Sequence, residues 1–146
     1  MTLPGAYKSQ PWINAHGRLG GHSAHLRKNV GLRSVDSAAF PHLVLVSLLY
    51  RDVTPEGQPG SPEEWARLDG TEERIADAMW DRHGAHFAMT VTSNGSRDLF
   101  FFLAAPASDA QIDELIQSIE PNVDYEFSFV YDAEWRPYRD LVRDTQ

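Results

Sequence analysis

The chain of 146 residues has the length of one domain, and its 42% hydrophobic and 23% charged residues are ordinary globular usage rather than the composition of a disordered chain. Its formal net charge of −8 argues against a nucleic-acid backbone or an anionic membrane surface as partner, because both require a dense surface of lysine and arginine. The lack of cysteine removes disulfides, thiol nucleophiles and thiolate metal ligands. No signal peptide is readable, and no apolar run approaches the roughly 20 residues that span a bilayer, so we expect a cytoplasmic location.

The first part of the chain, residues 1–39, is rich in glycine, histidine and basic residues and shows little periodicity. Trp12-Ile13 and His25-Leu26 are candidate short strands. The turn between them would be supplied by Gly17, Gly20 and Gly21. We therefore expect an N-terminal arm or hairpin over residues 1–39 that packs on a main domain of residues 40–146.

The main domain opens with a strand and the start of a helix. The run His42–Tyr50 is aliphatic and β-branched and has the length of a strand, and a loop rich in glycine and proline follows it. Ser61 is a suitable N-cap for the next helix, because Pro62 stands where a missing N–H costs nothing. Glu64 is expected to complete a capping box with Ser61.

This first helix is expected to run from Ser61 to Arg82 and to stop at Gly84. Glu72 falls where a further apolar residue would be expected on its buried face. The apolar residues at helical spacing are Trp65, Leu68, Ile75 and Met79.

Two strands joined by a tight turn follow the helix. Phe87–Val91 alternates between apolar and smaller or polar residues, whereas Asp98–Ala104 is a nearly continuous apolar run. Asn94-Gly95 between them is the strongest short hairpin signal, because both turn residues must accept positive φ.

The last third of the chain adds a helix, a strand and a tail. Ser108–Ile119 has a serine cap and an apolar face, and Pro121 ends it. Tyr125–Tyr131 alternates as a strand does. Ala133–Val142 is expected to form a short terminal helix, although Pro137 lies within it.

The order strand, helix, strand, strand, helix, strand predicts an α+β fold with a ferredoxin-like antiparallel sheet. In that topology the four strands lie in the order 4-1-3-2, with both helices on one face. The pattern of apolar residues agrees, because continuous runs are typical of central strands and alternation is typical of edge strands. The first and third strands have continuous runs, and the second and fourth alternate.

The sequence holds no pattern that catalysis or metal binding requires. The histidine pairs His22/His25 and His83/His86 lack a third ligand at a telling interval, so we expect no metal and no cofactor. The adjacent acidic residues stand on predicted helices, where they suit a solvated face or the helix dipole. No nucleophile motif and no phosphate-binding loop is present, so we expect no catalytic residue.

Four residues are candidates for binding a partner: Arg97 and Asp98 after the hairpin turn, and Trp135 and Tyr138 in the tail. Tryptophan, tyrosine and arginine are the residue types favoured in binding hot spots. In the alternative interpretation, Trp135 and Tyr138 fix the tail to the sheet, and Arg97 pairs with a neighbouring acid.

The second face of the sheet needs a cover, because two helices can protect only one face. Leaving several large apolar side chains in water would forgo several kcal/mol at roughly 25 cal/mol per Å². We expect the arm with Trp12 and Ile13 and the tail with Trp135 and Tyr138 to cover this face together. Homodimerisation is the next arrangement in order of preference.

Residues Phe40 to about Val142 resemble the bacterial family called domain of unknown function 695. This family is similar to the ribonuclease E inhibitor B family, which implies a ferredoxin-like fold and no established enzyme activity. The glycine-rich arm before Phe40 departs from the family pattern and is expected to be peculiar to this chain. The residues that carry the resemblance are Phe40-Pro41-His42, Leu68, Glu72-Glu73-Arg74-Ile75, Thr90, Asn94-Gly95, Arg97-Asp98-Leu99-Phe100-Phe101, Asp132, Trp135 and Tyr138.

These observations favour a small non-catalytic domain that binds a protein or has a regulatory role. The alternative is an enzyme or small-molecule sensor with a site between the N-terminal arm and the sheet. The residues do not identify the partner, because fold does not determine function.

Overall fold

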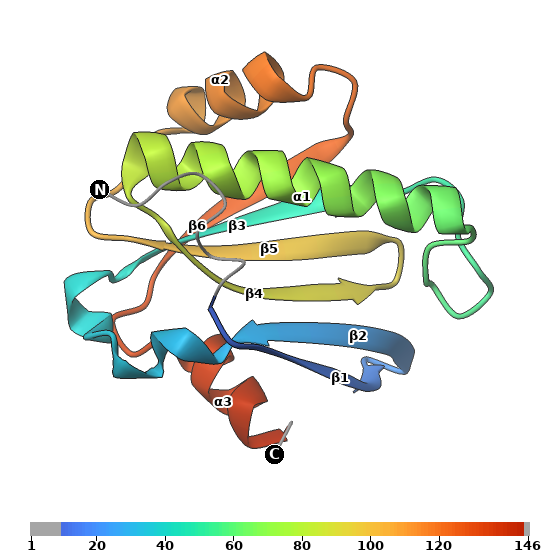
Figure 1. Ribbon diagram of the computed structural model, residues 1–146, viewed down its shortest axis with the longest axis horizontal. Helices are drawn as coiled ribbons and strands as arrows, with labels where there is room; N and C mark the ends of the chain where they lie inside the picture. Colours follow the sequence, from blue (N-terminus) through green and yellow to red (C-terminus); the bar gives the residue numbers. More distant parts are fainter. Residues whose placement is uncertain (1–9, 145–146) are drawn as a thin grey trace.

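The computed structural model describes the backbone of residues 10–144 and the side chains of residues 10–140 (Figure 1). These residues form an α+β fold that combines a six-stranded antiparallel sheet with three α-helices. Within this part of the chain, none of the helices has the length and hydropathy that a bilayer crossing requires. The elements in chain order are β1 (Trp12–Leu19), β2 (His22–Asn29), the 3₁₀ helices η2 (Val30–Ser34) and η3 (Ser37–Ala39), β3 (His42–Leu49), α1 (Pro62–His83), β4 (His86–Ser93), β5 (Ser96–Leu103), α2 (Asp109–Ile119), β6 (Tyr125–Tyr131) and α3 (Arg136–Asp144).

The sheet has the strand order β1-β2-β4-β5-β3-β6, and each neighbouring pair is antiparallel. The order predicted for the four strands of the main domain is confirmed, since β6, β3, β5 and β4 lie side by side in that order. The sheet is wider than predicted, because the β1–β2 hairpin continues it beyond β4. The prediction that β4 is an edge strand is therefore wrong, and β4 is buried at every position from Phe87 to Thr92.

The N-terminal arm is a regular hairpin. Its strands pair from Trp12↔Asn29 to Leu19↔His22, so they are much longer than the expected short strands. Gly20 and Gly21 form the turn with φ of 56° and 84°, a conformation that glycine adopts without steric cost. Gly17 lies within β1 and takes no part in the turn. The hairpin acquires its length because β2 pairs along the outer edge of β4.

The long helix α1 begins and ends as its sequence predicts, with one difference. The Ser61 hydroxyl accepts a hydrogen bond from the Glu64 backbone N–H at 3.1 Å, and Gly84 ends the helix with φ of 61°. The Glu64 carboxylate does not complete a capping box, because it accepts hydrogen bonds from Arg51 and Arg67 instead. The complete capping box is in α2, between Ser108 and the side chain and backbone of its third residue.

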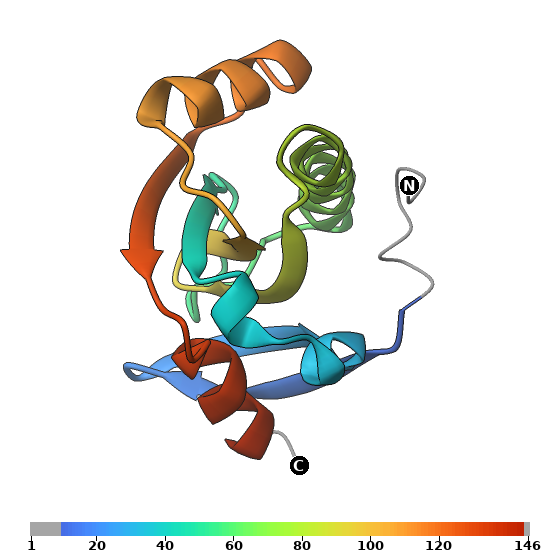
Figure 2. The same cartoon turned by 90° about the vertical axis from the view of Figure 1, so that its left-hand side faces the viewer.

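Both long helices cover the same face of the sheet, as predicted (Figure 2). The core on this face joins the two helices to the inner strands, and Phe101 at its centre is fully buried. Its other buried members include Val44, Val46, Leu48, Leu68, Ile75, Met79, Leu99, Ile112, Leu115 and Ile116.

The opposite face is covered by the arm and the tail, which confirms the expected arrangement in outline. Leu26 and Leu32 of the arm share a buried cluster with Trp135 and Tyr138 of the tail. The expectation that Trp12 of the arm covers this face is wrong, however. Trp12 packs on the helix-covered face with its ring 5.2 Å from Phe87, because its position along β1 places it on that side of the sheet.

Candidate functional site

Arg97, the first candidate, is buried beneath α1 with only 2% of its side chain exposed. Its Nη1 donates to Asp69 at 2.7 Å and to Glu72 at 3.1 Å. Its Nε donates to the Thr92 hydroxyl at 3.0 Å, and its guanidinium carbon lies 5.4 Å from the centre of the Trp65 ring. The alternative interpretation, in which Arg97 pairs with neighbouring acids, is confirmed.

A second arginine extends this ion-pair network to the hairpin. Arg27 of β2 bonds to the other carboxylate oxygen of Glu72, and its Nε lies 3.4 Å from the Thr90 hydroxyl. Its guanidinium also lies 5.4 Å from the Trp12 ring centre. The network thus balances two arginines with two acids and ties α1 to β2, β4 and β5. Glu72 occupies a core-facing position of the helix because both arginines meet it there.

Asp98 points to the other face of the sheet, since neighbouring residues of a strand alternate. Its carboxylate accepts hydrogen bonds from Ser47 at 2.7 Å and from Ser96 at 3.3 Å. Burial raises the pKa of Asp98 above its ordinary value despite these hydrogen bonds. It is therefore not part of the Arg97 network, although the two residues are adjacent in the chain.

The raised pKa predicts how Asp98→Asn changes stability. The folded protein disfavours the ionised carboxylate, so this cost is present above the folded-state pKa and is relieved as pH falls through it. The amide oxygen of asparagine can still accept both serine hydrogen bonds. We expect the variant to have a higher free energy of unfolding than wild type near neutral pH, with the difference shrinking in acid. Urea unfolding at pH of about 7 and about 4 measures this, and an equal loss at both values would contradict it.

Trp135 and Tyr138 anchor the tail, as the alternative interpretation states. Trp135 stacks on Phe102 with ring centres 4.3 Å apart, and its indole N–H donates to the Phe40 carbonyl at 2.8 Å. The Tyr138 hydroxyl donates to the Asn29 carbonyl at 2.7 Å, and burial raises the pKa of Tyr138 to about 12. Since 1% of Trp135 and 4% of Tyr138 are exposed, neither ring offers a surface for a partner.

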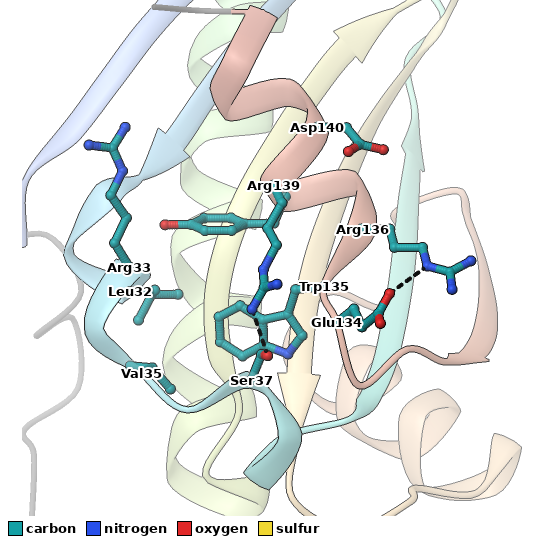
Figure 3. Close-up of a pocket in the computed structure, with 10 residues that line it drawn as sticks. Leu32, Arg33, Val35, Ser37, Glu134, Trp135, Arg136, Arg139 and Asp140 are labelled. Atoms are coloured by element: carbon teal, nitrogen blue, oxygen red, sulfur yellow. Dashed lines mark hydrogen bonds and ion pairs between the residues drawn. The ribbon is translucent and has the colours of Figure 1, made fainter.

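A cleft of about 510 Å³ opens beside these two rings, between η2, η3 and α3 (Figure 3). Its rim carries charges of both signs, and two of its arginines have partners: Arg136 pairs with Glu134 at 3.1 Å, and Arg139 donates to Ser37 at 3.1 Å. The cleft therefore lies between the arm and the tail. The buried ion-pair network lies on the opposite face of the sheet, between α1 and the strands.

The histidine pairs do not form a metal site in the described part of the chain, where no group of three or more histidine or acidic residues is placed to hold an ion. His25 stacks on His16 across the hairpin with ring centres 4.7 Å apart. Burial, followed by the neighbouring His16, lowers the pKa of His25. His86 packs against Phe40 and Trp80. These side chains are thus used in aromatic packing.

The two edges of the sheet differ in their side chains. At the β1 edge, the pairing of Pro11 with Val30 directs the backbone groups of every second residue outward, at Trp12, Asn14, His16 and Arg18. Three of these four are polar or charged, as is typical of an edge protected against further pairing.

At the β6 edge, the backbone N–H of Asp132 donates to the Pro41 carbonyl, and the N–H of Leu49 donates to the Asp124 carbonyl. The backbone groups of the even-numbered residues of β6 therefore point toward β3. The backbone groups that face outward therefore belong to Tyr125, Phe127, Phe129 and Tyr131.

The C-terminal half of β6 exposes apolar side chains as well as backbone. Phe129, Val130 and Tyr131 are 40%, 50% and 71% exposed. Few large apolar residues are exposed in the described part of the chain, and these three are adjacent in the sequence. Helix α2 covers only the start of the strand, where the Tyr125 hydroxyl donates to Asp113 at 2.7 Å. Sequence reasoning did not select this site, although the alternating aromatic residues of Tyr125–Tyr131 together with the prediction of an edge strand indicated it.

Comparison with known proteins gives one relationship. The family of unknown function DUF695 matches residues 10–142. No curated protein and no solved structure matches the chain. The match begins before β1, so the expectation that the arm is peculiar to this chain is wrong: the hairpin lies within the matched region. Since the match spans nearly all of the described residues, this chain belongs to the DUF695 family.

Proposed function

We propose that this domain is a non-catalytic binding module that docks an extended segment of a partner protein on the open edge of β6. One observation carries the proposal: the residues of β6 whose backbone groups point outward, Phe129 and Tyr131, belong to a stretch of apolar residues that are 40% to 71% exposed. An added strand uses both features, since main-chain hydrogen bonds give affinity and side-chain contacts give specificity.

The alternative of an enzyme or small-molecule sensor has weaker support. The cleft beside α3 has a volume in the range of ligand sites, which is roughly 300–1,000 Å³. Two of its rim arginines are already engaged, however: Arg136 pairs with Glu134, and Arg139 donates to the Ser37 hydroxyl. A site for a ligand would need polar groups that converge on open space.

Four further properties belong to the proposal. The resemblance to the ribonuclease E inhibitor B family favours a regulatory role and the ferredoxin-like description of the main domain. The resemblance to the bacterial DUF695 family suggests a bacterial source. The lack of cysteine suits a reducing cytoplasm.

Strand docking is tested with a display library of extended peptides that alternate apolar and polar residues, selected on the full chain. We expect selected peptides to protect the amide protons of Phe127, Phe129 and Tyr131 from hydrogen exchange. Tyr131→Pro removes one outward N–H, which leaves a carbonyl of the peptide unsatisfied at a cost of about 1–3 kcal/mol.

The matched control is Tyr131→Thr, which also removes the ring but retains the N–H. We expect Tyr131→Pro to bind selected peptides about tenfold more weakly than Tyr131→Thr, or weaker still. If no peptide is selected, or if the selected peptides leave the β6 amides unprotected and bind both variants equally, the proposal is wrong.

A further inference from the structure

The negative charge of the chain is concentrated in one segment. Nine of its 21 acidic residues lie between Asp98 and Glu134, and none of its 13 basic residues or 6 histidines does. This segment comprises most of β5, then α2 and β6. The rest of the chain is close to neutral, because the formal net charge of the whole is −8.

The acidic residues of this segment lie beside the open edge. In Figure 2, α2 lies at the top of the molecule and β6 descends along the left-hand side beneath it. The exposed acids of α2 are Asp109, Asp113 and Glu114, and Glu126 is exposed on β6 itself. Asp113 is tied to the first residue of β6 by the hydrogen bond from Tyr125. Asp113 and Glu126 therefore lie at the N-terminal half of the strand, and the apolar stretch forms its C-terminal half.

Most of this charge is not neutralised within the described part of the protein. Arg51 pairs with Asp124 at 2.7 Å, and Arg74 pairs with Glu120. For Asp109, Asp113, Glu114 and Glu126, by contrast, no arginine or lysine of residues 10–140 lies within ion-pair distance. A strand added to β6 would pair beside Glu126, with Asp113 close to the start of the strand.

We propose that the segment docked on β6 is basic and apolar, with lysine or arginine beside the Tyr125–Glu126 half of the strand and apolar residues beside the Phe129–Tyr131 half. Opposite charges at an interface accelerate encounter and fix the register of pairing. This inference rests on the proposed function and adds the chemistry of the partner.

The same charges disfavour a second copy of this chain as the occupant. Two copies paired along β6 would bring together two segments that each carry nine acidic residues and no basic residue. Juxtaposed like charges disfavour an interface. We therefore expect the protein alone to sediment as a monomer.

The test uses three synthetic peptides that share one alternating apolar half and differ in the other half, which carries lysine, serine or glutamate. Binding to the full chain is measured by fluorescence anisotropy at low and at high salt. We expect the lysine peptide to bind at least tenfold more tightly than the serine peptide and the glutamate peptide to bind most weakly. The differences should shrink at high salt, because salt screens exposed charges.

Charge-removal variants locate the effect. Glu126→Gln combined with Asp113→Asn, whose amide oxygen can still accept the Tyr125 hydrogen bond, should reduce the advantage of the lysine peptide severalfold. Glu56→Gln, in the loop before α1, should leave it unchanged. Equal binding of the three peptides, with the β6 amides protected in each, would overturn this inference and leave strand docking intact. Binding of none of them would contradict strand docking itself. A dimer of the free protein that Tyr131→Pro dissociates would overturn the inference in favour of a second copy.

Discussion

Deletion of residues 1–38 is expected to unfold the protein or to make it aggregate. The deletion removes Leu26 and Leu32, which are 6% and 2% exposed, at about 1.5–3 kcal/mol for each buried leucine. It also removes β2, which leaves the buried strand β4 as an unprotected edge. These losses approach the whole stability of a domain, about 5–15 kcal/mol. Thermal unfolding and size-exclusion chromatography of the truncated chain measure the result.

Two leucines of the arm supply a matched pair for this prediction. Leu32→Ala should lower the free energy of unfolding by about 2–5 kcal/mol, because a buried leucine leaves a cavity. Leu19→Ala, at the hairpin tip where the side chain is 42% exposed, should change it by less than about 0.5 kcal/mol. A truncated protein that stays monomeric with unchanged melting temperature would show that the arm covers nothing.

Replacement of Arg97 by methionine is expected to lower the free energy of unfolding by about 3–5 kcal/mol. Removing Arg97 takes away one of the two arginines that compensate Glu72, which is only 6% exposed, and leaves Arg27 as its one remaining arginine. Thr92 would also lose the donor to its hydroxyl. Urea unfolding measures the change, with Arg67→Met as the control. Arg67 is 41% exposed in its pair with Glu64, and such surface pairs contribute less than about 1 kcal/mol.

The double variant Arg97→Met with Glu72→Gln separates the buried charge from the lost packing. Each single variant already breaks the Arg97–Glu72 pair, so the double variant should be less destabilised than the sum of the single variants by about 1–3 kcal/mol. Additive losses, or a single variant within about 1 kcal/mol of wild type, would show that the ion-pair network does not clamp α1 to the sheet.

The elements whose causes are local could be predicted from the amino-acid sequence. Ser61 with Pro62 starts α1, and Asn94-Gly95 turns the chain with φ of 48° and 88°. Strand Tyr125–Tyr131 has the predicted bounds. Such features depend on residues within a few positions of one another, so a single sequence is sufficient to find them. The central position of β3 and β5 was also predictable, because strands covered on both faces carry continuous apolar runs.

The features that depend on residues distant in the chain could not be predicted from local sequence patterns. The weak pattern of residues 10–29 gave no sign of a long hairpin, because its pairing partner β4 lies about 60 residues later. The sequence pattern predicts an apolar residue at position 72, and Glu72 is accommodated on the buried face of α1 because Arg27 and Arg97 pair with it. A buried polar side chain destabilises the folded state when it has no partner and can stabilise it when it has one. That partner is supplied by strand pairing and packing, which no local pattern encodes.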